Sequence, residues 1–89
     1  MPNLFVSYDL INQKNYPAVE KAIKECGTAV RVLLSVWYIK SDDTHIAVRD
    51  HIQKAMDKDD RLLVINAGDA AWINVLPGAS EDILSNWSK

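Results

Sequence analysis

The chain has 89 residues, of which 48% are hydrophobic and 25% charged, and this composition is typical of a folded globular domain rather than of a disordered or fibrous segment. Ten lysines and arginines against twelve aspartates and glutamates give a net charge of −2, which disfavours non-specific binding to the phosphate backbone of nucleic acid. No apolar run reaches about 18 residues, so we expect no membrane span, and the length predicts a single domain over residues 1–89.

The cellular location is inferred from the first residues and from the cysteine content. The N-terminus lacks the basic start and the long apolar stretch of a signal peptide. Cys26 is the only cysteine and cannot form a disulfide within the chain, which agrees with a reducing compartment. We therefore expect a cytoplasmic protein.

The first predicted element is a strand over residues 4–10, LFVSYDL, because apolar side chains alternate along it. The more apolar set, which we place toward the core, comprises Leu4, Val6, Tyr8 and Leu10. Phe5, Ser7 and Asp9 then lie on the opposite face of the sheet. The carboxylate of Asp9 thus ends a hydrophobic strand on the face away from the core.

A first helix is predicted after the polar loop INQKN. Asn15, with Pro17 just behind it, is typical of a helix start, and Gly27 ends the helical pattern. Helical spacing forms one apolar stripe, made of Val19, Ala22, Ile23 and Cys26. Cys26 is therefore interpreted as a core residue and not as a nucleophile.

The run over residues 29–40, AVRVLLSVWYIK, is rich in β-branched and aromatic residues and is predicted to be extended, with apolar side chains on both faces. It forms either one bent strand or two strands split around Ser35. Capping side chains over residues 41–44, SDDT, then predict a second helix. Its apolar positions are Val48, Ile52, Ala55 and Met56.

The last third of the chain predicts two strands and a short helix. Residues 61–67, RLLVINA, form the first strand, Gly68 and Asp69 a hairpin turn, and residues 70–76, AAWINVL, the second strand. A terminal helix from Ser80 is expected to seat three apolar side chains on the body, Ile83, Leu84 and Trp87.

These elements predict an α+β fold, a ferredoxin-like sandwich with a four-stranded, mainly antiparallel sheet, two helices on one face and a short C-terminal helix. One bent strand over residues 29–40 gives the order β-α-β-α-β-β. A split around Ser35 gives the strict ferredoxin-like order. In both cases the two helices leave the other face of the sheet bare.

The bare face is expected to be apolar and therefore to be an interaction surface. The side chains placed on it are Phe5, Leu33, Trp37 and Ile39. A twofold homodimer would bury them. Alternatively, the C-terminal segment with Trp87 folds across this face within one chain.

Several side chains that often carry chemistry have structural interpretations here. His45 and His51 are six residues apart on the second predicted helix, so they do not form a metal-binding pair and are interpreted as surface residues. Trp37 and Trp72, predicted on neighbouring strands, fit the core or a dimer face better than a base-stacking platform, because no basic residues are interleaved in AAWINV. A charged turn accounts for the acidic cluster of Asp57, Asp59 and Asp60.

Asp9 is the strongest candidate for chemistry. A dimer meeting at the bare face would bring two copies of Asp9 close together, and paired carboxylates can hold Mg²⁺ or Mn²⁺. Such a metal can activate water and stabilise charge on a phosphodiester. Alternatively, Asp9 accepts hydrogen bonds from backbone amides in the loop after the first strand.

Most of the chain resembles two families. A strand ending in Tyr8-Asp9, an amphipathic helix and the stretch Ser35-Val36-Trp37 resemble the small ferredoxin-like nucleases of CRISPR adaptation, the second protein of the spacer-integration pair. The segments SVWYIKSDDTHIAVRD and DKDDRLLVINAGDAAW resemble more closely a group of small bacterial proteins labelled SinR-like.

The resemblance implies a dimer of ferredoxin-like protomers in which Asp9 matches the acidic residue implicated in metal-dependent nuclease activity. Related folds include ribonuclease toxins of the virulence-associated protein D type. DNA bridging in the CRISPR-associated relatives depends on basic surfaces. This chain departs from them, because the charges of its first helix alternate over Glu20-Lys21 and Lys24-Glu25 and cancel.

Two functional hypotheses follow. In the first, the protein is an Mg²⁺- or Mn²⁺-dependent endonuclease, acting on RNA rather than DNA, with the metal between two Asp9 carboxylates and Ser7 lining the cleft. Lys40 or Arg49 would then contact phosphate, although Arg49 with Asp50, beside Lys40, also fits a surface salt-bridge network. In the second, the same dimer is catalytically inert and binds a protein partner or a small ligand.

Overall fold

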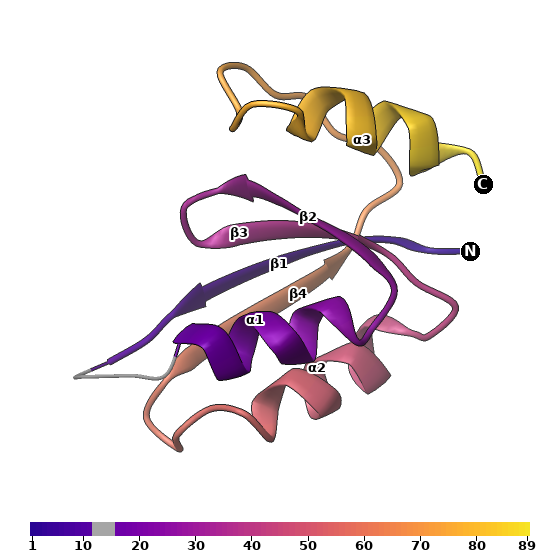
Figure 1. Cartoon of the computed structure of the whole chain (residues 1–89). Helices are drawn as coiled ribbons and strands as arrows, with labels where there is room; N and C mark the ends of the chain where they lie inside the picture. Colours follow the sequence, from indigo (N-terminus) through magenta and orange to yellow (C-terminus); the bar gives the residue numbers. More distant parts are fainter. Residues whose placement is uncertain (12–15) are drawn as a thin grey trace.

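Four strands form one antiparallel sheet in the computed structural model, which describes residues 1–11 and 16–89 (Figure 1). The strands lie in the order β2-β3-β1-β4, and each neighbouring pair is antiparallel. The elements along the chain are β1 (Asn3–Asp9), α1 (Tyr16–Lys24), β2 (Thr28–Leu33), β3 (Val36–Lys40), α2 (His45–Gln53), β4 (Arg61–Asn66) and α3 (Ala79–Trp87). The β-α-β-β-α-β order of the first six elements confirms the predicted α+β, ferredoxin-like fold.

The sheet separates two layers of helices. α1 and α2 pack side by side on one face, and α3 lies on the other face over β2 and β3 (Figure 1). A second, smaller core beneath α3 centres on Val32, Tyr38 and Ile83. The main core, beneath α1 and α2, comprises Leu4, Val6, Tyr8, Val19, Ala22, Ile23, Cys26, Trp37, Ile39, Val48 and Ile52.

None of the described helices is long and apolar enough to cross a membrane.

The apolar stripe predicted for the first helix is confirmed, since its residues within α1 and Cys26 just after the helix are all buried. The second stripe is confirmed in part. Val48 and Ile52 of α2 are buried, whereas Ala55 and Met56 lie beyond the end of α2 and are half-buried against the main core. Thr44 caps α2, since its Oγ1 accepts a hydrogen bond from the backbone N of Ala47 (3.1 Å). The helix start predicted at Asn15 lies outside the described residues.

Residues 29–40 form two strands, so the predicted alternative with a split around Ser35 is confirmed. The placement of Trp37 and Ile39 on the bare face was wrong. Trp37 pairs with Val6 and Ile39 with Leu4 across β3 and β1, and directly paired residues of antiparallel strands share a face. Since Val6 and Leu4 face the main core, the side chains of Trp37 and Ile39 lie in the main core as well.

The predicted strand over residues 70–76 and the hairpin before it are absent from the described structure. After β4 the chain instead crosses to the opposite edge of the sheet, where the backbone N of Leu76 donates to the carbonyl oxygen of Val32 (2.9 Å). Asn74 adopts a positive φ of 56°, which interrupts an extended conformation. Trp37 and Trp72 consequently belong to different cores on opposite faces of the sheet, and not to neighbouring strands.

α3 covers part of the face that was expected to be bare. The ring of Trp87 stacks on Tyr38, with centroids 6.0 Å apart and planes at 19°, and also lies 6.3 Å from Phe5. Ile83 is fully buried beneath the helix, whereas Leu84, which was predicted to pack on the body, is 64% exposed. The alternative in which the C-terminal segment folds across this face is thus confirmed for the half formed by β2 and β3, and the half formed by β4 stays open.

Candidate functional site

The open half of the sheet face exposes large apolar side chains. Leu63 and Ile65 of β4 pair with Ser7 and Phe5 of β1, so all four point to the α3 side of the sheet. Leu63 is 56% and Ile65 46% exposed. Because Leu62 and Val64 face the main core, β4 is apolar on both faces.

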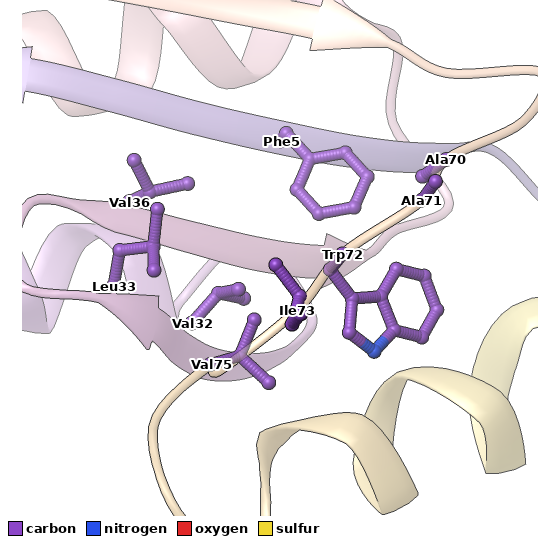
Figure 2. Close-up of a pocket in the computed structure, with 9 residues that line it drawn as sticks. All are labelled: Phe5, Val32, Leu33, Val36, Ala70, Ala71, Trp72, Ile73 and Val75. Carbon is purple, nitrogen blue, oxygen red and sulfur yellow. The ribbon is translucent and has the colours of Figure 1, made fainter.

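An apolar pocket of about 450 Å³ lies between the sheet and the segment before α3 (Figure 2). β1, β2 and β3 form one side of it, and the segment over residues 70–75 forms the other. Its only polar side-chain atom, the indole nitrogen of Trp72, turns toward α3 and donates to the Ser80 hydroxyl (3.1 Å). The lining residues are Phe5, Val32, Leu33, Val36, Ala70, Ala71, Trp72, Ile73 and Val75. The pocket is therefore suited to an apolar group.

Ser7 and Asp9 lie together, as the alternation along the first strand predicted. They line a shallow groove of about 230 Å³ at the end of β1. The described partner of the Asp9 carboxylate is Arg61, whose Nη1 lies 3.9 Å from Oδ2. With side-chain exposures of 69% for Asp9 and 72% for Arg61, this ion pair is well screened by water.

Among the described residues, the side chains around Asp9 do not form a ready magnesium or manganese site. Such ions are bound mainly by carboxylate, carbonyl and water oxygens. Among residues 1–11 and 16–89, no group of three or more His, Cys, Asp or Glu side chains is arranged to hold a metal. The charged neighbour of Asp9 is an arginine, whose guanidinium group repels a cation.

Lys40 does not share the groove. It pairs with Asn3, at the opposite end of β1 from Asp9, and is only 4% exposed. Its Nζ donates to the backbone oxygen of Trp87 (2.8 Å) and to Asn3 Oδ1 (3.2 Å). The ammonium group thus anchors the C-terminal end of α3 to the sheet, where the helix dipole favours a positive charge, and is not available to phosphate at the surface.

Arg49 is also distant from the groove, because α2 lies on the other face of the sheet. Its guanidinium group forms an exposed ion pair with the adjacent Asp50 (2.9 Å). This supports the interpretation of Arg49 as a surface salt-bridge residue. Lys40, which was expected beside this network, is buried elsewhere.

The remaining titratable candidates have structural roles. Cys26 is buried, its Sγ lies 3.3 Å from the carbonyl oxygen of Ala22, and burial, with the carboxylates of Asp43 and Glu25, raises the pKa of its thiol. A raised pKa keeps the thiol protonated and unreactive, so the interpretation as a core residue is confirmed. Both histidines are exposed, as predicted.

The acidic cluster after α2 contains a carboxylate that organises a turn. Asp60 Oδ1 accepts a hydrogen bond from the backbone N of Ile11 (2.8 Å), and Oδ2 accepts one from the backbone N of Asp57 (2.9 Å). The interpretation of this cluster as a charged turn is thereby supported.

The apolar pocket and the exposed side chains of β4 were not predicted from the sequence. A signal for β4 was present, because RLLVIN has apolar residues at consecutive positions and therefore on both faces of a strand. No local signal marked the pocket, since its walls come from four separate segments. A comparison of the chain with models of known protein families finds no family that matches it.

Proposed function

We propose that the protein is a catalytically inert interaction module that binds an apolar side chain of a protein partner in the apolar pocket. The observation that carries this proposal is a pocket of about 450 Å³ without an available polar side chain, between the sheet and the segment over residues 70–75. Its volume lies in the range of ligand sites, and buried apolar anchors dominate the affinity of protein interfaces. We place the protein in the cytoplasm, where a reduced, buried Cys26 is stable.

The pocket also gives the module its specificity. Burying a polar or charged group there would leave that group without a hydrogen-bond partner, at a cost of about 1–3 kcal/mol for a neutral group and more for a charged one. A leucine, isoleucine or aromatic side chain meets no such penalty. The partner is therefore expected to present an exposed apolar residue on a strand edge, a helix face or a loop.

Substitution of Ala71 by glutamate is expected to weaken the binding of an apolar ligand at the pocket. Ala71 is exposed and lines the pocket, so a carboxylate at this position is tolerated by the fold but meets an apolar anchor on binding. We expect titration with the fluorescent probe anilinonaphthalene sulfonate to show saturable binding by the natural chain and at least about tenfold weaker binding by the variant.

Ala47→Glu is the matched control for this experiment. Ala47 is likewise an exposed alanine, but it lies on α2, on the other side of the sheet. This variant adds the same negative charge without changing the pocket and should bind the probe like the natural chain. Equal binding by all three proteins would show that the probe does not occupy the pocket, and absence of binding by the natural chain would refute the proposal.

A metal-dependent nuclease of the SinR-like or CRISPR-adaptation type is the second proposal. One observation favours it: Ser7 and Asp9 share an exposed groove at the end of β1, where the resemblance implies the acidic site. Since the described residues group no three metal-binding side chains, further donors would come from a second copy of the chain or from the nucleic acid. RNA is the favoured substrate, because the net charge of −2 disfavours the bridging of DNA by a basic surface.

The nuclease proposal predicts that Asp9→Asn removes RNA cleavage in the presence of Mn²⁺. We expect a loss of about a hundredfold or more, because a neutral amide is a much poorer ligand for a hard cation. Labelled RNA and DNA are incubated with and without Mn²⁺. Asp50→Asn, which changes another exposed aspartate paired with an arginine, serves as the control. Cleavage at the same rate by the Asp9 variant would exclude Asp9 from the mechanism.

A further inference from the structure

β4 is an edge strand whose outer backbone groups can be identified from the ladder. The backbone N of Tyr8 donates to Ser35 on the β3 side (3.2 Å), whereas the carbonyl oxygen of Asn3 accepts from Ala67 on the β4 side (2.9 Å). Even-numbered residues of β1 thus bond to β3 and odd-numbered ones to β4, because the pattern alternates along an antiparallel strand. By the same alternation, the N–H and C=O groups at positions 62, 64 and 66 of β4 point away from the sheet.

These outward groups are available for pairing. Within the part of the chain that the structure describes, the backbone groups at these three positions form no hydrogen bond. The other edge of the sheet differs, since Leu76 bonds to Val32 of β2 and the crossing segment thereby covers part of that edge. β4 is therefore the more open of the two edges.

The side chains of β4 do not protect this edge. Natural edge strands usually carry a lysine, a proline or an inward-pointing charge that discourages pairing with another chain. In β4 the only charged residue is Arg61 at its first position, and the four residues that follow are apolar. Two of them, Leu63 and Ile65, are exposed on the side that α3 leaves open.

We propose that β4 pairs antiparallel with β4 of a second copy of the chain, with Val64 opposite Val64, so that two sheets join into one of eight strands. This register is self-complementary. The outward groups at positions 62, 64 and 66 meet those at 66, 64 and 62, which allows about six hydrogen bonds between the copies. Leu63 of each copy then lies opposite Ile65 of the other, in the non-hydrogen-bonded pairs where side chains are closest.

Other registers are less favourable. A shift that sets Leu63 opposite Leu63 places Arg61 opposite Ile65, so the exposed face keeps one apolar pair instead of two. It also pairs the outward groups at positions 62 and 64 alone, which allows about four hydrogen bonds instead of six. A shift of a single residue would oppose side chains that point to different faces of the sheet. The pairing of Leu63 with Ile65 is thus the one in which backbone bonding and apolar contact agree.

The edge dimer has a consequence for Asp9. Asp9 pairs with Arg61 at the start of β4, so the two copies of Asp9 lie near opposite ends of the joined strands. Strand geometry sets them about 25 Å apart. In this dimer a second copy of the chain is one partner of the proposed interaction module. The dimer does not bring two Asp9 carboxylates to a shared metal.

The test measures the oligomeric state of the full chain by sedimentation velocity over a range of concentrations. The natural chain is expected to dimerise reversibly, and Leu63→Lys to raise the dissociation constant by about tenfold or more. Leu84→Lys, which changes a leucine of similar exposure on α3, should dimerise like the natural chain. A natural chain that stays monomeric at millimolar concentration, or a Leu63→Lys variant that dimerises like the natural chain, would overturn the proposal.

Disulfide trapping tests the register separately. An oxidised mixture of Leu63→Cys and Ile65→Cys chains should yield the mixed disulfide in preference to either homodimer, because only position 63 lies directly opposite position 65. Preferential cross-linking of position 63 to itself would contradict this register. The edge dimer and the apolar pocket can be tested separately. Ala71→Glu should weaken binding of the probe and leave dimerisation intact. Leu63→Lys should weaken dimerisation and leave binding of the probe intact.

Discussion

Replacement of Gly27 by alanine is expected to destabilise the fold by about 3 kcal/mol or more, through overlap with the backbone and an unfavourable φ. Gly27 joins α1 to β2 with a φ of +156°, and a Cβ at this position would overlap the carbonyl oxygen of Lys40. It would also lie 3.1 Å from the Cα of Ser41. Backbone atoms of a paired strand cannot move aside as a flexible side chain can.

The strain cannot be relieved locally, because the two backbone segments are tied together. The Ser41 hydroxyl donates to the carbonyl oxygen of Cys26 (2.6 Å), and Thr28 pairs with Lys40 at the start of the β2–β3 ladder. Moving Gly27 away from Lys40 would lengthen these bonds. It would also disturb Lys40, whose ammonium group anchors α3.

Two other glycines provide controls in urea unfolding experiments. Gly68→Ala should change the free energy of unfolding little, because nothing lies within 4 Å of the added methyl group. Gly78→Ala also meets open space, but its φ of +84° predicts a loss of about 1 kcal/mol from backbone strain alone. A Gly27→Ala variant as stable as Gly68→Ala would contradict the close approach of Gly27 to Lys40.

Replacement of Ile83 by alanine is expected to cost about 3 kcal/mol and to loosen α3 from the sheet. Ile83 is fully buried in the smaller core with Val32 and Tyr38, and few other large apolar side chains of α3 reach the sheet. Truncation leaves a cavity beneath a short helix that is connected to β4 by a long irregular segment. The free energy of unfolding in urea measures the loss.

Leu84→Ala is the matched control, because Leu84 is the next residue of the same helix and is 64% exposed. It should leave stability within about 0.5 kcal/mol of the natural chain. Limited proteolysis adds a local readout, since loosening of α3 should accelerate cleavage over residues 67–78 only in the Ile83 variant. Equal stability of the two variants would show that α3 does not depend on this contact.

The position of α3 determines which surface remains for association. α3 covers part of the sheet face formed by β2 and β3, through Ile83, Trp87 and the hydrogen bond that Lys40 donates to the end of the helix. Association is left to the half formed by β4 and to the apolar pocket between the sheet and residues 70–75. A dimer that buried the whole face, with Trp37 and Ile39 at its centre, is incompatible with this arrangement, because both side chains lie in the main core.

The groove at Ser7 and Asp9 could be predicted from the sequence, whereas the apolar pocket and the burial of Lys40 could not. Alternation along LFVSYDL placed Ser7 and Asp9 on one face together, and the structure brings them to one groove. Lys40 was predicted at the surface, beside Arg49 and Asp50. Its burial depends on Asn3 and on the end of α3, which are far from it in the chain.

Local periodicity and capping were sufficient to predict the helices, most strands up to residue 66 and the ferredoxin-like class. The pattern over residues 29–40 left one bent strand or two strands open. Strand register and the packing of a connecting segment depend on residues distant in the chain, and they settle the split at Ser35, the position of Trp37 in the main core and the path of residues 67–78 across the sheet. The open edge at β4 depends on the local sequence and on the tertiary packing. Its apolar residues are visible in the sequence, and its exposure results from where α3 and the crossing segment pack.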